Sequence, residues 1–347
     1  MEKAKQLPSG TWRIRVYVRK EADGKKVYKT FTASSKAEVE LKAAQFANSP
    51  DRVSPDNITV KDAIERYIEG NEAELSPSTV RGYIKDLRAL QPLHHIKIKK
   101  LRSHDIQMYI KEQQLDGKSP KSITNRCSLL KKALKYNHID VTQFDIKLPK
   151  VKIKKGYAPA SEDVAKLYEA ANRKMKICIF LAAKHSLRRG EIPALTYGDL
   201  EGNRLHIHAD IVQDKDNKWI YKDHPKTDES NRFVYLSDEE LKLIGTGFPN
   251  QPIVDIVPSS IGTSYYNLKK KLGLMHIRFH DFRVYFASAS AAANIPERYA
   301  ASMGGWKEGS TVLRDHYRKP IKTMEEKYAM KLNQKMDEYF NGIENIG

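Results

Sequence analysis

The sequence has only two cysteines, Cys127 and Cys178, among its 347 residues. Two thiols cannot form a disulfide framework, so the disulfide-rich secreted class is excluded, and we expect a reducing cytosol and packed rather than reactive thiols. The chain also lacks any apolar run near the roughly 20 residues that span a bilayer. Its first residues, MEKAKQLPSGTW, lack the apolar core of a secretory signal. We therefore expect a cytoplasmic protein with no membrane partner.

No complete phosphate-binding loop of the form GxxxxGKS or GxxxxGKT occurs in the chain, and no group of residues has clear metal-ligand spacing. His206 and His208 would lie on one face of an expected strand and could mimic a zinc pair. No cysteine or further histidine lies near them in the sequence. The sequence therefore predicts neither a cofactor nor a bound metal.

Negative charge is also scarce, with 43 acidic residues against 61 lysines and arginines, a formal net charge of +18 and a pI of about 9.5. The excess is spread along the chain, at +5 in residues 1–57, +7 in residues 58–150 and +6 in the remainder. This balance predicts a polyanionic partner, most commonly nucleic acid. The lack of a long apolar run disfavours a membrane surface. Because no single tail holds the charge, we expect a protein that surrounds or tracks its nucleic acid.

A chain of 347 residues is too long for one ordinary hydrophobic core, and 40% hydrophobic residues are enough to bury several cores. Length and sequence pattern together divide the chain into three parts. Residues 1–57 predict a small β-sheet, a helix over 36–47 and a linker. The first strand alternates apolar and polar residues, and the turn signal Asp23-Gly24 precedes a return strand over 27–32. One expected face of the first strand carries Arg13, Arg15 and Arg19.

Residues 58–150 predict a purely helical part. Thr59, Ser76 and Ser119 precede apolar helical patterns as caps, and a proline follows each serine in the first turn. The expected exposed faces of these helices carry basic side chains, which are either solvated or in contact with phosphates. Their concentration in one compact part favours phosphate contacts. These residues are Arg81, Lys85, Arg88, Lys121, Arg126, Lys131 and Lys132.

Residues 151–347 begin within a basic linker and predict mainly helices, with a small antiparallel sheet from segments 204–212 and 219–236. The whole chain is thus predicted to be a multidomain α+β protein. Near its end, residues 321–340 predict a helix with an apolar stripe, and such a stripe must dock on some other surface. The stripe consists of Met324, Tyr328, Leu332, Met336 and Phe340.

Two stretches of this third part contain a basic residue that could take part in catalysis. Residues 185–200 include Arg188 and Glu191, whose default interpretation is a charged helical cluster with a surface ion pair. Residues 224–236 place Lys226 in a polar turn before a strand, which alone indicates only a hairpin.

Two further stretches add the other titratable groups. Residues 280–296 place His280 and Arg283 three apart on a helix that begins with an aspartate, so their side chains share a face. Residues 303–319 contain Tyr317 among several cations. Each of the four stretches is weak evidence when it is taken alone.

Together and in this order, the four stretches resemble the tyrosine recombinase (phage integrase) family. The family's first catalytic arginine lies in a Leu-Arg-x-x-Glu helix, which residues 187–191 match, and its lysine sits in a β-turn before a strand. Its His-x-x-Arg motif corresponds to residues 280–283, and a Gly-Trp pair precedes its tyrosine, as in residues 305–306. The resemblance covers nearly the whole chain. The matched catalytic residues are Arg188, Lys226, His280, Arg283, Trp306 and Tyr317.

This resemblance implies that DNA is cut and rejoined through a 3′-phosphotyrosine at Tyr317. The permanently charged guanidiniums of Arg188 and Arg283 would bind the non-bridging phosphate oxygens. A tyrosine hydroxyl has a pKa near 10 and needs such a cationic site, or a base, to ionise. Lys226 would protonate the departing 5′ oxygen. Because the linkage conserves the energy of the broken bond, neither ATP nor a metal is required.

His280 would assist proton transfer or bind the scissile phosphate, and Trp306 would contribute an indole hydrogen bond and packing. The sequence departs from the family pattern in three ways, none of which removes a proposed catalytic group. Trp306 replaces a more frequent histidine, Tyr317 lies eleven residues beyond it rather than the commonest ten, and Val284 occupies a position that is often histidine. Tyr328 and Tyr339 lie too far downstream to replace Tyr317.

The resemblance also implies roles for the three parts: an arm-site DNA-binding domain in residues 1–57, a core-binding domain in 58–150, and a catalytic domain with a C-terminal tail helix in 151–347. The implied partners are attachment-site DNA, a homotetramer on paired sites, an excisionase and a host DNA-bending protein. The implied place of action is the bacterial cytoplasm, at the nucleoid. The tail helix would dock on a neighbouring protomer, although docking on its own domain remains an alternative.

Two other functions remain open at this stage. A type IB topoisomerase uses similar chemistry, but the separate sheet and helical parts favour a recombinase. A DNA-binding or architectural protein that has lost its chemistry would have no need of Tyr317 after the other matched residues.

Overall fold

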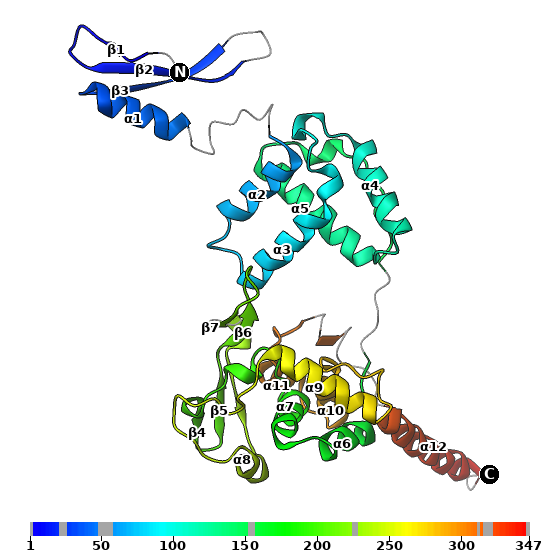
Figure 1. The fold of residues 1–347 in the computed structure, drawn as a ribbon. Helices are drawn as coiled ribbons and strands as arrows, with labels where there is room; N and C mark the ends of the chain where they lie inside the picture. The colour runs from blue at the N-terminus through cyan, green and yellow to red at the C-terminus, as the bar shows by residue number, and fades with distance from the viewer. Residues whose placement is uncertain are drawn as a thin grey trace. The chain divides into compact units, whose positions relative to one another are not determined.

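The structure is a computed structural model that describes residues 3–20, 26–47, 58–151, 157–223, 228–310, 313–314 and 322–344 (Figure 1). The chain divides into two compact units, Met1–Lys152 and Ile153–Gly347. No helix within the described ranges is long and apolar enough to cross a membrane. The expected division into three domains stays a prediction.

The N-terminal segment forms an antiparallel three-stranded sheet with one helix, as predicted (Figure 1). Strands β1 (Lys5–Gln6), β2 (Trp12–Lys20) and β3 (Lys26–Ala33) lie in that order, and α1 (Lys36–Ala47) follows. The alternating pattern of β2 buries Ile14 and Val16 against α1 and leaves Arg13, Arg15 and Tyr17 exposed. The register shifts between Tyr17 and Arg19. The Arg19 side chain and the Asp23-Gly24 turn lie outside the described residues.

The second segment is helical, as predicted, and consists of α2 (Val60–Gly70), α3 (Pro77–Ala89), α4 (Ser103–Leu115) and α5 (Pro120–Tyr136). The three predicted caps are present: Thr59 forms a capping box with Asp62, and the hydroxyls of Ser76 and Ser119 accept hydrogen bonds from N3 amides. The sequence analysis did not assign α4, whose N-cap is Arg102 rather than a short polar residue.

The second unit begins with α6 (Ser161–Glu169) and α7 (Arg173–Lys184), and continues into two small sheets. Strands β4 (Leu200–Glu201), β5 (Arg204–Ile207) and β8 (Arg232–Tyr235) form an antiparallel sheet, whereas β6 (Asp210–Gln213) and β7 (Trp219–Lys222) form a separate hairpin. The predicted strand segments are therefore confirmed, but they build two sheets rather than one.

The remaining helices are α8 (Asp238–Ile244), α9 (Pro258–Lys271), α10 (Asp281–Ala292), α11 (Glu297–Gly304) and α12 (Lys322–Glu344). Helix α7 is the centre of this unit: eight of its side chains are buried, in one core with residues of β5, β8, α9 and α10. Helices α7 and α10 pack in that core, and Arg283 at the start of α10 contacts Ser186, which follows α7.

The predicted tail helix is present as α12. Its described side chains, those of residues 325–336, are all exposed, including the apolar Tyr328, Met330, Leu332 and Met336. The Tyr328 hydroxyl donates a 2.7 Å hydrogen bond to the Ala292 carbonyl at the end of α10. Among the described residues of the apolar stripe, Tyr328, Leu332 and Met336 therefore remain 43–61% exposed.

Candidate active site

Arg188 lies in a turn, not in the helix that was predicted for it. Helix α7 ends at Lys184, and Ser186 adopts a left-handed backbone with φ of 59°, which reverses the chain. Leu187 is buried, and its amide donates to the Leu181 carbonyl at 3.0 Å, so the turn is anchored to α7. This arrangement leaves the Arg188 side chain 32% exposed.

Glu191 is buried, with a side chain only 1% exposed, so the predicted surface ion pair is wrong. Its carboxylate accepts hydrogen bonds from the Arg188 amide at 2.8 Å, from Arg188 Nη1 at 2.5 Å and from Arg232 Nη2 at 3.0 Å. Burial alone would raise the pKa of Glu191. The guanidiniums of Arg232, Arg188 and Arg283 outweigh that effect and lower the pKa to about 2. Glu191 is therefore ionised at neutral pH and fixes the orientation of Arg188.

His280 and Arg283 lie at the start of α10, as predicted, with His280 as the N-cap residue. Phe279 and Phe282 contact each other and Tyr265 of α9 edge-on, with ring centroids 5.4–5.5 Å apart, which fixes the start of this helix. Arg283 is 2% exposed. Its Nη1 donates to the Ser186 carbonyl. Arg283 thus holds the turn that carries Arg188.

The imidazole of His280 has an exposed edge, but the protein around it removes part of its hydration. This loss of hydration, and next the Arg283 guanidinium, lower the pKa of His280 below its usual value of 6.5. The ring is therefore neutral at pH 7 and can accept a proton.

A pocket of 400 Å³ opens beside these groups. Arg278, in its lining, is fixed by a two-pronged ion pair with the buried carboxylate of Asp281, with Nη2 2.6 Å from Oδ1. The pocket therefore combines cations with a neutral imidazole, a combination suited to an anion such as a phosphodiester. Its lining residues are Leu187, Arg189, Arg278, Phe279, His280 and Arg283.

Trp306 is buried between α10 and α11, where its ring stacks on Phe286 with centroids 6.0 Å apart. The Arg283 guanidinium lies 4.5 Å from the centre of the indole ring. A side chain at Gly304 would collide with this ring, and Gly305 adopts a left-handed φ of 68°. Leu313 packs in the same cluster, so Trp306 supports the chain four residues before Tyr317.

Lys226 and Tyr317 lie outside the described residues. Two described residues that contact the site lie in the segments that follow Lys226 and precede Tyr317. Ser230, four residues after Lys226, accepts a 2.8 Å hydrogen bond from Arg188 Nη1 through its hydroxyl. Gly305, whose carbonyl lies 3.3 Å from Arg188 Nη2, begins the segment that leads to Tyr317.

Sequence analysis assigned no role to Arg232, a position downstream of Lys226 that matches the family pattern; its side chain is buried and 3% exposed. The strand β8 reads Arg-Phe-Val-Tyr and buries its first and third residues, so Arg232 shares the core face with Val234. An arginine at a core-facing position of a strand must have buried partners, and this signal could have revealed it.

His206 and His208, which could mimic a zinc pair in the sequence, contact nearby polar side chains. His206 Nε2 lies 2.7 Å from Asn231 Oδ1, and His208 contacts the carboxylates of Asp199 at 2.9 Å and Asp223 at 3.3 Å. Within the described parts of the chain, no group of three or more potential metal ligands is found.

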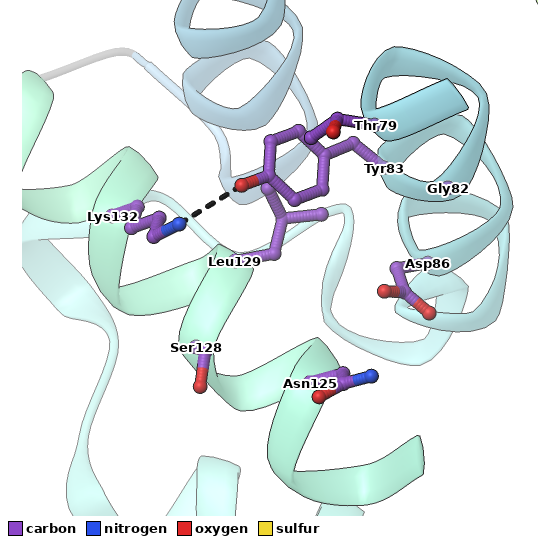
Figure 2. A pocket seen from close by; sticks show the side chains of 8 residues that line it. All are labelled: Thr79, Gly82, Tyr83, Asp86, Asn125, Ser128, Leu129 and Lys132. Atoms are coloured by element: carbon purple, nitrogen blue, oxygen red, sulfur yellow. Dashed lines mark hydrogen bonds between the residues drawn. The ribbon is translucent and has the colours of Figure 1, made fainter. Parts of the chain in front are cut away.

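A second candidate surface is a groove of 330 Å³ between α3 and α5 in the first unit. Figure 2 shows residues of both helices around it, and Lys132 Nζ donates to the Tyr83 hydroxyl at 2.9 Å. Each helix contributes residues at the same i, i+3, i+4, i+7 spacing. The groove is lined by Thr79, Gly82, Tyr83 and Asp86 of α3 and by Asn125, Ser128, Leu129 and Lys132 of α5.

The predicted phosphate-contacting residues of this unit differ in exposure. Arg81, Lys85 and Lys121 are exposed, and Lys131 is partly buried. The expectation that Arg126 is exposed is wrong: its side chain is only 12% exposed, lies 3.8 Å from Asp86 and donates to Gln113. Arg126 therefore joins α5 to α3 and α4.

The comparisons with known proteins all identify integrases or tyrosine recombinases. Residues 160–323 match the model of the Phage integrase family, and residues 64–137 match that of the phage integrase N-terminal SAM-like domain. A "Tyrosine recombinase XerC-like" protein of Caldanaerobacter subterraneus subsp. tengcongensis is 23% identical over 85% of this chain and 88% of its own length.

Three solved structures share the fold. The Tn1549 transposon integrase in complex with transposon right end DNA has a TM-score of 0.63 and 16% identity, over 74% of this chain and 94% of its own. A lambda integrase dimer bound to a core site has a TM-score of 0.57 and 15% identity, over 91% and 94%. A lambda integrase tetramer bound to a Holliday junction has a TM-score of 0.56 and 15% identity, over 90% and 93%.

We expect His280 to titrate below pH 6.5 in the DNA-free protein, because reduced hydration and Arg283 both disfavour the imidazolium. A bound phosphodiester places negative charge beside the ring and should raise the pKa. An NMR titration of the ring C–H signals, assigned with His280→Gln, measures both values. A midpoint above 6.5 without DNA, or a lower midpoint with DNA, would contradict this assignment.

Proposed function

Because the chain belongs to the phage integrase family and is thus a tyrosine recombinase, we propose that it integrates or excises a mobile element through a phosphotyrosine at Tyr317. The observation that carries this proposal is the arrangement of Arg188 and Arg283. Both are fixed through one short turn, by Glu191 and by the Ser186 carbonyl respectively. A cationic pocket opens beside that turn.

In this mechanism, the Tyr317 oxygen attacks the scissile phosphorus while the bond from phosphorus to the 5′ oxygen breaks. The tyrosine proton leaves to the neutral His280, and Lys226 protonates the departing 5′ oxygen, so that charge is balanced. Arg188 and Arg283 stabilise the negative charge on the non-bridging oxygens in the transition state. Attack by a 5′ hydroxyl on the phosphotyrosine reverses these steps and rejoins the strand.

Trp306 acts as a support in this mechanism. Its ring underlies the Arg283 guanidinium at 4.5 Å and packs with Leu313. The site therefore couples the position of an arginine with that of the chain leading to the nucleophile. A topoisomerase without recombination and a non-catalytic architectural protein are both less consistent with the family match over residues 64–137 and 160–323.

The two other parts of the chain supply DNA affinity in this proposal. In residues 58–150, the exposed Arg81, Lys85 and Lys121 and the partly buried Lys131 contact backbone phosphates. In residues 1–57, the strand that carries Arg13, Arg15 and Arg19 enters a groove of a separate arm site. Arg126 is not among the proposed contacts, because it is held within the helical core.

The proposed partners are attachment-site DNA, sister protomers in a tetramer, an excisionase and a host DNA-bending protein. The lambda integrase tetramer on a Holliday junction supports the oligomer by analogy of fold. The exposed apolar residues of α12 support a protomer contact. The proposed place of action is the bacterial cytoplasm, at the nucleoid.

Replacing Tyr317 with Phe should abolish the covalent protein–DNA adduct on a nicked suicide duplex. DNA binding should stay within a few-fold, since one hydrogen bond contributes about 1 kcal/mol. Denaturing gel electrophoresis detects the adduct, and Tyr328→Phe is the matched control that should retain it. Adducts formed by the Tyr317 variant would show that another residue is the nucleophile.

Lys226→Ala should slow cleavage by about 10²-fold or more on an ordinary duplex. The loss should be much smaller on a duplex with a 5′-phosphorothiolate, because a thiolate leaves without a general acid. Single-turnover cleavage rates on the two duplexes provide the measurement, with Lys218→Ala, an exposed lysine of the β6–β7 turn, as control. Equal losses on both duplexes would remove Lys226 from the acid role.

Truncation after Lys322 should leave binding to a single site near normal but abolish cooperative assembly on paired sites. Leu332→Gln should weaken assembly in the same direction, because Leu332 is 61% exposed and its loss does not disturb the protein's own packing. The neighbouring Lys331→Gln serves as control, and native mass spectrometry of paired-site complexes counts protomers. Wild-type tetramer formation by the truncated protein would show that the tail has no such role.

A further inference from the structure

Arg232 is a buried arginine to which the proposed mechanism gives no role. Its guanidinium donates four hydrogen bonds: to Met303 O and Ser230 O at 3.0 Å each, to Glu191 Oε2 at 3.0 Å and to Ser186 O at 3.4 Å. It uses all three of its nitrogens in doing so.

These four acceptors belong to three separate segments of the chain. Ser186 and Glu191 bracket the turn that presents Arg188. Ser230 closes the short helical turn at 228–230 that follows Lys226, and its hydroxyl contacts Arg188 Nη1. Met303 lies in the last turn of α11, three residues before Trp306.

The third segment also fits closely against Arg232. A side chain at Gly305 would meet the Arg232 guanidinium at 3.0 Å from Nη1, and Gly305 needs its left-handed φ to turn the chain towards Trp306. The carbonyl of the same glycine lies 3.3 Å from Arg188 Nη2. Arg232 and Arg188 therefore both lie against the turn at Gly305.

We propose that Arg232 is a positioning residue that, together with Ser230, joins the turn that carries Arg188, the helical turn at 228–230 and the end of α11 before Trp306 into one rigid unit. This inference rests on the proposed strand-transfer function and adds a residue that does not touch DNA. Arg232 sets the direction of the Arg188 guanidinium through Glu191, and Ser230 fixes the same guanidinium directly.

Only arginine can fill this position. A planar guanidinium reaches a carboxylate and three carbonyls in different directions at once, whereas the ammonium of lysine is a single point with three donors. Arg232→Lys preserves the charge that Glu191 requires, so it tests geometry rather than charge. Arg204→Lys is a matched control, because Arg204 lies in the neighbouring strand β5 and stacks on Phe233, 3.6 Å from the ring centre, away from the site.

The experiment compares single-turnover cleavage of two suicide duplexes, one with a normal scissile phosphodiester and one with a methylphosphonate there. A methylphosphonate carries no charge, so its cleavage depends less on a well-placed arginine. We expect Arg232→Lys to lower the cleavage rate about 10²-fold on the phosphodiester, which is the typical cost of a small misplacement. On the methylphosphonate, the cleavage rate should fall by less than about tenfold. Ser230→Ala should show the same preference with smaller losses, and Arg204→Lys should match the wild type.

Thermal unfolding and DNA binding of each variant separate misfolding from misplacement. If Arg232→Lys does not fold, Ser230→Ala tests the inference instead, because that variant removes only one hydroxyl oxygen. Equal losses on both duplexes, or wild-type rates on both, overturn the inference for a folded variant. The wild type tests the proposed function separately. If the wild type forms a covalent adduct on neither duplex, that function is rejected, and this inference with it.

Discussion

The site depends on one buried carboxylate. Glu191 sits among three guanidiniums, and its ionised form is favoured because their combined attraction exceeds the cost of burial. Removing one partner of such a pair commonly costs about 3–5 kcal/mol, because it leaves an uncompensated buried charge. The orientation of Arg188, the packing of Arg232 and the position of Arg283 therefore all depend on the ionised carboxylate of Glu191.

Much of the fold was predictable because its signals are local. Ser76-Pro77 and Ser119-Pro120 mark the starts of α3 and α5, and the alternation in β2 predicts which of its faces is buried. Helix α4 was missed where its start lacks a short polar cap. The position of His280 and Arg283 at the start of α10 was predicted from their three-residue spacing on a helix that begins with an aspartate.

Other features were not predictable, since they depend on contacts between distant residues. The turn at Ser186 replaces the predicted helix because its carbonyl is bound by Arg283, which lies 97 positions away. Glu191 looked like a surface residue until strand β8 brought Arg232 against it. Arg126 looked like a DNA contact until Asp86 and Gln113 were found beside it. In each case a local charge pattern was compatible with two environments, and tertiary structure selected one.

The charge of the Glu191 cluster has a thermodynamic consequence. Three guanidiniums act on Glu191, and Asp210 is a second carboxylate that interacts with Arg188, so positive charge remains in excess and the guanidiniums repel each other. In the proposed function, a phosphodiester that enters the neighbouring pocket removes part of that repulsion, and only the folded second unit has this pocket. By mass action, DNA then stabilises the very unit that acts on it.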